Sequence, residues 1–188
     1  MIDLETLSTR TDAAIIQIGA VFFDPRDRGR VFNDKAFNTY IKVQDGGGAI
    51  DNGTLGWWLQ QPHAPEVGKA LWNDETPMLG LALEGLTQFP TKDHANIPGL
   101  ESWQDVGGIW SKGPSFDMAI LKSAFAKFGA ETPWDFRRER DCRTVIALAG
   151  ADACRPDSLG LQAHDAVDDC VYQIMEVQKA LSILGKSL

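Results

Sequence analysis

The segment from Ala13 to Asp24 constrains the fold more than any other part of the chain. It is rich in β-branched and aromatic residues and ends in an Asp-Pro pair, so it predicts a long strand that is buried on both faces. Two neighbouring segments add to this prediction. Residues 2–6 and residues 37–43 both alternate apolar and polar side chains, which is typical of strands. Three consecutive strands predict an antiparallel meander.

The pattern changes to helices after these strands. Helical spacing of apolar residues predicts helices over residues 54–61, 65–72, 77–89, 116–128, 143–149 and 165–184. Residues 106–111 predict a fourth strand, a weak signal near 141–144 marks a fifth, and residues 151–161 predict a loop. Ser115 is the expected N-cap of the helix that follows it. This order predicts an α/β fold in a single domain of residues 1–188, with a mixed sheet flanked by helices.

Charge and composition exclude several classes of protein. The net charge of −8 argues against a protein that coats nucleic acid through a broad basic surface, although an enzyme with a small site stays open. No apolar run approaches about 20 residues, so we expect no membrane-spanning helix. The three cysteines have no Cys-x-x-Cys spacing, and acids interrupt the apolar residues at the start. We therefore expect a protein without a disulfide framework, a structural zinc site or a signal peptide, located in the cytoplasm.

Two acids in the first predicted strand are candidates for metal binding. Asp3 and Glu5 are two residues apart, so in a strand they point to the same face, while Ile2 and Leu4 pack on the other. Two strand residues span roughly 6–7 Å, close enough for both carboxylates to hold one metal cluster. A surface strand with two solvated acids explains the same pattern, so the prediction depends on further acids that converge on this face.

Further candidates lie at the starts of two later helices. Asp117 falls in the first turn of the helix after the fourth strand, and His164 stands just before a helix that begins with Asp165, Asp168 and Asp169. Acids favour helix N-termini through the helix dipole, which is an alternative explanation for both clusters. A histidine in a loop beside acids can also act as a general base near neutral pH.

The order and spacing of these residues resemble the DEDDh group of DnaQ-like 3′→5′ exonucleases. Asp3-x-Glu5 is similar to the first motif, Asp117 follows a Ser-Phe pair as in the second, and His164, Ala166 and Asp169 match His-x-Ala-x-x-Asp. The segments 3–6, 57–58, 110–117 and 140–144 look like a phage and bacterial subgroup. That subgroup includes the T-even phage exodeoxyribonuclease and is related to the mycobacterial RNase AS.

The resemblance implies a fold, a reaction and a set of ligands. The expected fold is RNase H-like, with a central mixed five-stranded sheet whose second strand runs antiparallel to the rest. The resemblance implies that two Mg²⁺ or Mn²⁺ ions are held by Asp3, Glu5, Asp117 and Asp169, with His164 as the general base. The expected reaction releases nucleoside monophosphates from the 3′ ends of single strands, with DNA favoured over RNA.

Several other residues are expected to contact the substrate. By resemblance, Thr6 and Leu7 lie near the terminal nucleotide. Phosphates are expected to meet Lys112, Arg143 or a member of the 137–140 charge run, although a solvated surface explains that run equally well. The expected substrate-binding set is Thr6, Leu7, Lys112, Ser115 and Arg143.

Some side chains have two interpretations. One of Trp57 and Trp58 is expected in the core, and the other could stack on a base. Asp165 and Asp168 match variable motif positions, so they are expected outside direct metal contact. His63 and His94 are interpreted as surface residues in polar loops.

Alternatives remain open at the level of function. An exoribonuclease is one, and an inactive module that binds nucleic acid or protein is another. The sequence leaves the oligomeric state open, with a homodimer among the expectations. Only Met1 and Ile2 precede Asp3, so we also hypothesise that the chain starts further upstream or that its first strand is truncated. In either case, a longer version should melt at a higher temperature.

Overall fold

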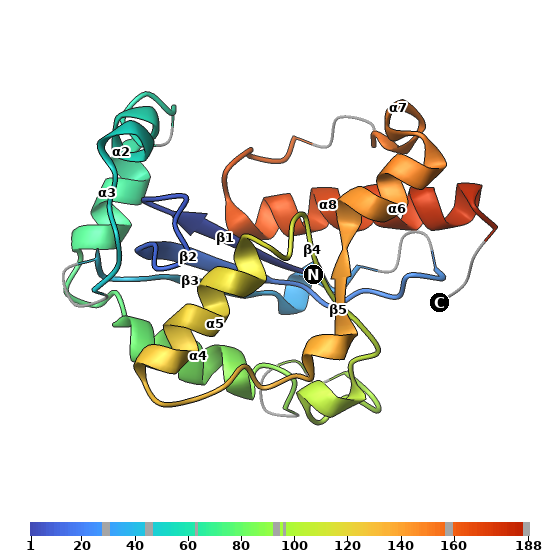
Figure 1. Cartoon of the computed structure of the whole chain (residues 1–188), viewed down its shortest axis with the longest axis horizontal. Helices are drawn as coiled ribbons and strands as arrows, with labels where there is room; N and C mark the ends of the chain where they lie inside the picture. The colour runs from blue at the N-terminus through green and yellow to red at the C-terminus, as the bar shows by residue number, and fades with distance from the viewer. Residues whose placement is uncertain are drawn as a thin grey trace.

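The architecture is described from a computed structural model, which covers residues 1–27, 31–43, 47–62, 64–91, 95, 97–156 and 160–185. Strands β1 (Ile2–Thr6), β2 (Ile15–Ala20) and β3 (Phe37–Tyr40) form a three-stranded sheet in that order. Both pairings are antiparallel, which confirms the predicted meander. Strands β4 (Ile109–Ser111) and β5 (Glu139–Asp141) form a separate parallel pair (Figure 1).

The predicted five-stranded sheet is not seen within the described residues, where the strands form a group of three and a group of two. Strand β2 runs antiparallel to β1 and β3, as expected. Strand β4 lies near β1 but makes no ladder with it. Strands β4 and β5 have only three residues each, which leaves little backbone for a continuous ladder.

Helices make up most of the rest of the described chain. The α-helices are α2 (Asn52–Trp58), α3 (Ala64–Trp72), α4 (Leu79–Gln88), α5 (Asp117–Lys127), α6 (Cys142–Ala149), α7 (Ala151–Cys154) and α8 (Ala166–Ile183). Short 3₁₀ helices span Asn33–Lys35, Trp103–Asp105 and Phe136–Arg138. Six helices match predicted segments. Helix α7 corrects the predicted loop at 151–161, because its four residues are too few to show a helical period.

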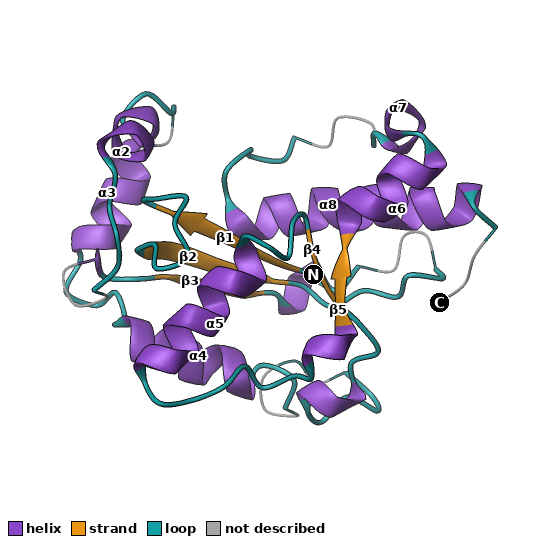
Figure 2. Ribbon diagram, in the orientation of Figure 1, coloured by secondary structure: helices purple, strands orange, loops and turns teal. Residues whose placement is uncertain are grey.

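The helices cover the three-stranded sheet on both faces (Figure 2). Ile2, Leu4 and Ile18 point to one face and pack in the main core with side chains of α4 and α5. Helix α8 lies on the other face, against β1 and β2, and α6 and α7 pack on α8. Helices α2 and α3 pack through a separate small cluster that includes Leu7 and Trp58. No helix in the described ranges is long and apolar enough to span a membrane.

Candidate active site

The acidic pair on β1 points toward α8, away from the main core. Ile2 and Leu4 are 1% and 4% exposed in that core, so the predicted division of β1 into an apolar and an acidic face is confirmed. Gln173 of α8 donates a 2.7 Å hydrogen bond from Nε2 to Asp3 Oδ1. Glu5 is buried, and the strand register shifts directly after it, between Glu5 and Thr6. Such irregularities are common beside active sites, where they re-aim side chains.

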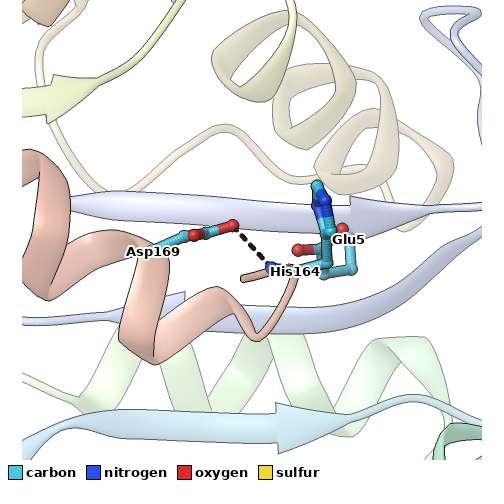
Figure 3. A group of neighbouring side chains, drawn as sticks. All are labelled: Glu5, His164 and Asp169. Carbon is cyan, nitrogen blue, oxygen red and sulfur yellow. Dashed lines mark hydrogen bonds between the residues drawn. The ribbon is translucent and has the colours of Figure 1, made fainter. Parts of the chain in front are cut away.

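The start of α8 brings a histidine and an acid to the same place. His164 adopts a left-handed backbone with φ of 65°, which turns the chain into the helix. Its backbone N–H donates to Asp169 Oδ2 at 3.2 Å, and Figure 3 shows this bond beside Glu5. A ring nitrogen of His164 and carboxylate oxygens of Glu5 and Asp169 all lie within 4.8 Å of one another. These three side chains could hold a metal ion.

Asp117 completes the acidic cluster from α5. It lies in the first turn of that helix, as predicted, and its side chain is buried. The predicted N-cap at Ser115 is wrong, because Phe116 occupies that position and Ser115 is exposed. The backbone N–H groups of Phe116 and Asp117 both donate to the Gly113 carbonyl, and the helix begins one residue later than predicted. The Leu4 backbone interacts with the Asp117 carboxylate and favours its ionised form.

Burial disfavours the charged forms of all four carboxylates, and repulsion by the other acids adds to this effect at Asp3 and Glu5. Desolvation and Asp117 raise the pKa of Asp3 well above its usual range, although Gln173 opposes this. Desolvation, and then Asp3 and Asp169, raise the pKa of Glu5 to about 9. Desolvation raises the pKa of Asp117 to about 7 and also raises the pKa of Asp169. A divalent cation fits this site, because carboxylate oxygens are its preferred ligands and its charge would relieve the repulsion.

The two adjacent tryptophans have different environments. Trp58 is 5% exposed and donates from Nε1 to the Thr6 carbonyl at 2.9 Å, so it is the predicted core member of the pair. Trp57 is 40% exposed, and its ring meets the His164 imidazole edge-on with centroids 4.6 Å apart. Helix α2 therefore contributes an aromatic wall to the histidine side of the site.

Two cations predicted to bind phosphate lie beside the acids. Lys112 Nζ is 2.6 Å from Glu176 Oε2, and its charge lowers the pKa of Asp3 and Asp169. Arg143 is exposed, its guanidinium approaches Gly113, and its charge lowers the pKa of Asp117.

The arginine-rich run at 137–140 makes local contacts. Arg137 pairs with Asp135, while Arg138 and Arg140 donate to backbone carbonyls.

The remaining residues singled out in the sequence make structural contacts around the acidic cluster. The Thr6 hydroxyl donates to the Ser8 carbonyl at 2.7 Å, and Leu7 is buried in the small cluster under α2 and α3. Both directly follow Glu5, but neither presents a free side chain to solvent. Asp165 and Asp168 accept hydrogen bonds from backbone N–H groups. His63 and His94 lie outside the described residues.

Comparison with known proteins identifies the family. A model of the Rv2179c-like 3′-5′ exoribonuclease domain matches residues 1–181. The chain belongs to this family. It is a 3′-5′ exonuclease, as the motifs predict. The exodeoxyribonuclease of Enterobacteria phage T4 is 26% identical over 208 aligned residues, which cover 96% of this chain and 88% of the relative.

Two glutamines beside this candidate site were not predicted from the sequence. Gln17 on β2 and Gln173 on α8 are 1% and 5% exposed, and both bond to acids near the site. A polar residue within an apolar strand, as at Gln17, is a usable signal. Its partner is 148 positions away and becomes visible only in the fold.

Proposed function

We propose that the chain hydrolyses terminal phosphodiesters at the 3′ ends of single-stranded nucleic acid, with DNA favoured, and releases nucleoside monophosphates. The convergence of Glu5, His164 and Asp169 within 4.8 Å carries this proposal. Asp3, Glu5, Asp117 and Asp169 would hold two Mg²⁺ or Mn²⁺ ions in an RNase H-like fold. When bound, such ions supply a more acidic water and stabilise the charge that develops on the leaving oxygen.

In this proposal His164 is the general base. Its imidazole stands beside the acids, and the 3.2 Å bond from its backbone to Asp169 holds the loop that carries it. The edge of the ring contacts Trp57, which restricts the directions in which the imidazole can turn. A base within reach of a water can accept its proton as the water attacks phosphorus.

Other side chains would orient the strand that is being cleaved. Arg143 is exposed near Asp117 and is the cation best placed to meet a phosphate. Lys112 is engaged by Glu176, so we assign it mainly to balancing the acidic cluster. The exposed face of Trp57 could stack on a base, since aromatic rings bind single strands in this way. Thr6, Leu7 and Ser115 stay in the proposed substrate-binding set through their positions beside Glu5 and Asp117.

Two observations favour different substrates, one DNA and the other RNA. The T4 relative is named an exodeoxyribonuclease, which favours DNA. The matching family is described as an exoribonuclease domain, which favours RNA as the second candidate substrate. A nuclease specific for RNA needs contacts to the 2′-hydroxyl. An inactive binding module is disfavoured, because all four acids and the histidine are present at the site.

The test uses 5′-labelled DNA and RNA strands of identical sequence, each with purified protein in Mg²⁺, Mn²⁺ or EDTA. We expect a ladder that shortens from the 3′ end in either metal but not in EDTA, with DNA cleaved faster. Faster cleavage of RNA would replace the DNA proposal with the second candidate. Cleavage that persists in EDTA would contradict the metal-dependent site.

We also propose that residues 1–188 act as one exonuclease domain and that a homodimer forms through exposed apolar side chains of α2 and α3. Leu59, the C-cap residue of α2, and Trp72 of α3 are 72% and 60% exposed. Light scattering of the purified protein should give twice the mass of the chain, which is 20.6 kDa. The mass of a single chain would contradict the dimer.

A further inference from the structure

A buried glutamine ties the start of α8 to the sheet. Gln17 lies on β2 and is 1% exposed. Its Nε2 donates to Asp165 Oδ2 and to Asn38 Oδ1, both at 3.0 Å. Its Oε1 accepts from the backbone N–H of Ala166 at 3.2 Å. Each polar atom of this amide therefore has a partner, which is the condition under which a buried polar network specifies one geometry.

The partner carboxylate, Asp165, connects the helix to the sheet. Its Oδ1 accepts from the backbone N–H groups of Val167 and Asp168 at 3.1 and 3.2 Å, so it caps α8. Its Oδ2 accepts from Gln17, and the hydroxyl of Tyr40 lies 3.5 Å away. One side chain thus satisfies the helix N-terminus and attaches it to strands β2 and β3.

The strand register places this attachment directly beside the acidic pair. Gln17 lies opposite Glu5 in the β1–β2 ladder, and Gly19 lies opposite Asp3. Residues directly opposite each other in a ladder share a face of the sheet. A Cβ at Gly19 would lie 2.5 Å from the backbone carbonyl of Ala166, so only glycine lets α8 approach this closely.

The attached segment carries two residues of the site. His164 immediately precedes Asp165, and the Asp169 backbone N–H donates to the Asp165 carbonyl at 2.8 Å. A shift or rotation of the start of α8 would therefore move the imidazole and the Asp169 carboxylate together, away from Glu5. Misplacement of reacting groups by about 1 Å can cost about 100-fold in rate.

We propose that Gln17 and Asp165 are positioning residues, which hold His164 and Asp169 against Glu5 by fixing the start of α8. This inference rests on the roles proposed above for His164 and Asp169. A purely structural role differs from it in one measurable respect. Loss of a structural contact lowers the stability of the folded protein, but it leaves the turnover and the metal affinity of each folded molecule unchanged.

The first test compares Gln17→Leu with Ile18→Val. Ile18 lies on the same strand but points into the main core, so its truncation costs stability without touching the start of α8. At saturating Mn²⁺ and well below both melting temperatures, we expect Gln17→Leu to lower kcat about 10-fold or more, with little change in KM. Calorimetric titration should show about 10-fold weaker Mn²⁺ binding, as for other residues that orient metal ligands. Ile18→Val should match wild type in both.

A second set of variants separates the link to the sheet from the helix cap. Asp165→Asn keeps an oxygen that can cap α8, but it places an amide N–H₂ against the Gln17 N–H₂ group. We expect it to behave like Gln17→Leu. The double variant Gln17→Glu with Asp165→Asn exchanges donor and acceptor and keeps the total charge. If the effects of Gln17→Glu and Asp165→Asn were independent, the kcat of the double variant would be lowered by the product of the two single losses. We expect its kcat to be at least about 5-fold higher than that product predicts.

Each outcome decides the inference. Normal kcat and Mn²⁺ affinity in Gln17→Leu, or in Asp165→Asn if the first variant does not fold, would overturn it. A double variant with strictly multiplicative losses would also overturn it. The proposed function is tested separately by Asp169→Ala. If that variant retains full activity, the function is wrong. If it is inactive while Gln17→Leu is normal, only the positioning role is wrong.

Discussion

At the scale of single residues, the account assigns different tasks to side chains that lie within a few ångströms of each other. Asp169 accepts the His164 backbone N–H, and both meet Glu5. In the proposed mechanism the acids bind cations and the imidazole accepts a proton. Loss of the two kinds of group should therefore have different consequences.

We predict that Asp169→Ala abolishes 3′-end cleavage. His164→Ala should lower kcat by about 100-fold or more, since a general base contributes on the order of 10²–10⁴. The measurement is single-turnover cleavage of a 5′-labelled strand. Asp152→Ala is the matched control, because that acid is fully exposed on α7, and it should be as active as wild type. Near-normal turnover in either site variant would refute the assigned roles.

Arg143 provides a further prediction at this scale. Arg143→Ala should raise KM for single strands several-fold and make binding less sensitive to salt, because it removes one phosphate contact. Arg137→Ala is the control, since that arginine is exposed and pairs with Asp135. Equal effects of the two substitutions on KM, compared across several salt concentrations, would contradict the proposed contact between Arg143 and a phosphate.

At the scale of elements, helix α2 shows how neighbouring residues divide between stability and function. Trp58 supports the end of β1 through its bond to the Thr6 carbonyl, while Trp57 contacts His164.

Trp58→Phe should lower the free energy of unfolding by about 1–3 kcal/mol, because the Thr6 carbonyl would lose its buried partner. Trp57→Ala should leave stability nearly unchanged but raise KM and lower kcat. Chemical denaturation and steady-state kinetics on both variants test the pair. The reverse assignment, with Trp57→Ala unstable and Trp58→Phe catalytically impaired, would contradict it.

The success of sequence-based prediction also depends on the element. Long periodic segments such as α8 were predicted closely, because many apolar residues share one stripe. The four-residue helix α7 was missed, and β5 was only approximately placed, because three or four residues show no period. The acids and His164 were predicted through motif spacing. The support from Gln17 and Gln173 was not, because it depends on packing between distant segments.

At the scale of the whole molecule, the acidic cluster couples stability to pH. Glu5 has its pKa raised from 4.5 to about 9, chiefly by desolvation and then by Asp3. Between these values the folded protein binds more protons than the unfolded chain. The free energy of unfolding therefore falls as pH rises through this window.

In EDTA, we predict that the melting temperature falls between pH 5 and pH 9. A pKa shift of one unit corresponds to about 1.4 kcal/mol, and about 1 kcal/mol changes the melting temperature of a chain this long by about 2–4 °C. A fall of about 5 °C or more is expected. Glu5→Gln should reduce it, because the neutral amide has no charge to desolvate. A melting temperature that depends on pH equally in both proteins would contradict the proposed cause.

The most direct test of the carboxylate site is a calorimetric titration of the metal-free protein with Mn²⁺ near neutral pH. The account predicts two bound ions per chain, with release of protons from the acids whose pKa values are raised. It also predicts that Asp169→Ala loses at least one of these ions, while Asp152→Ala keeps both. No detectable binding, or binding unaffected by Asp169→Ala, would contradict the claim that Asp3, Glu5, Asp117 and Asp169 form the metal site of this exonuclease.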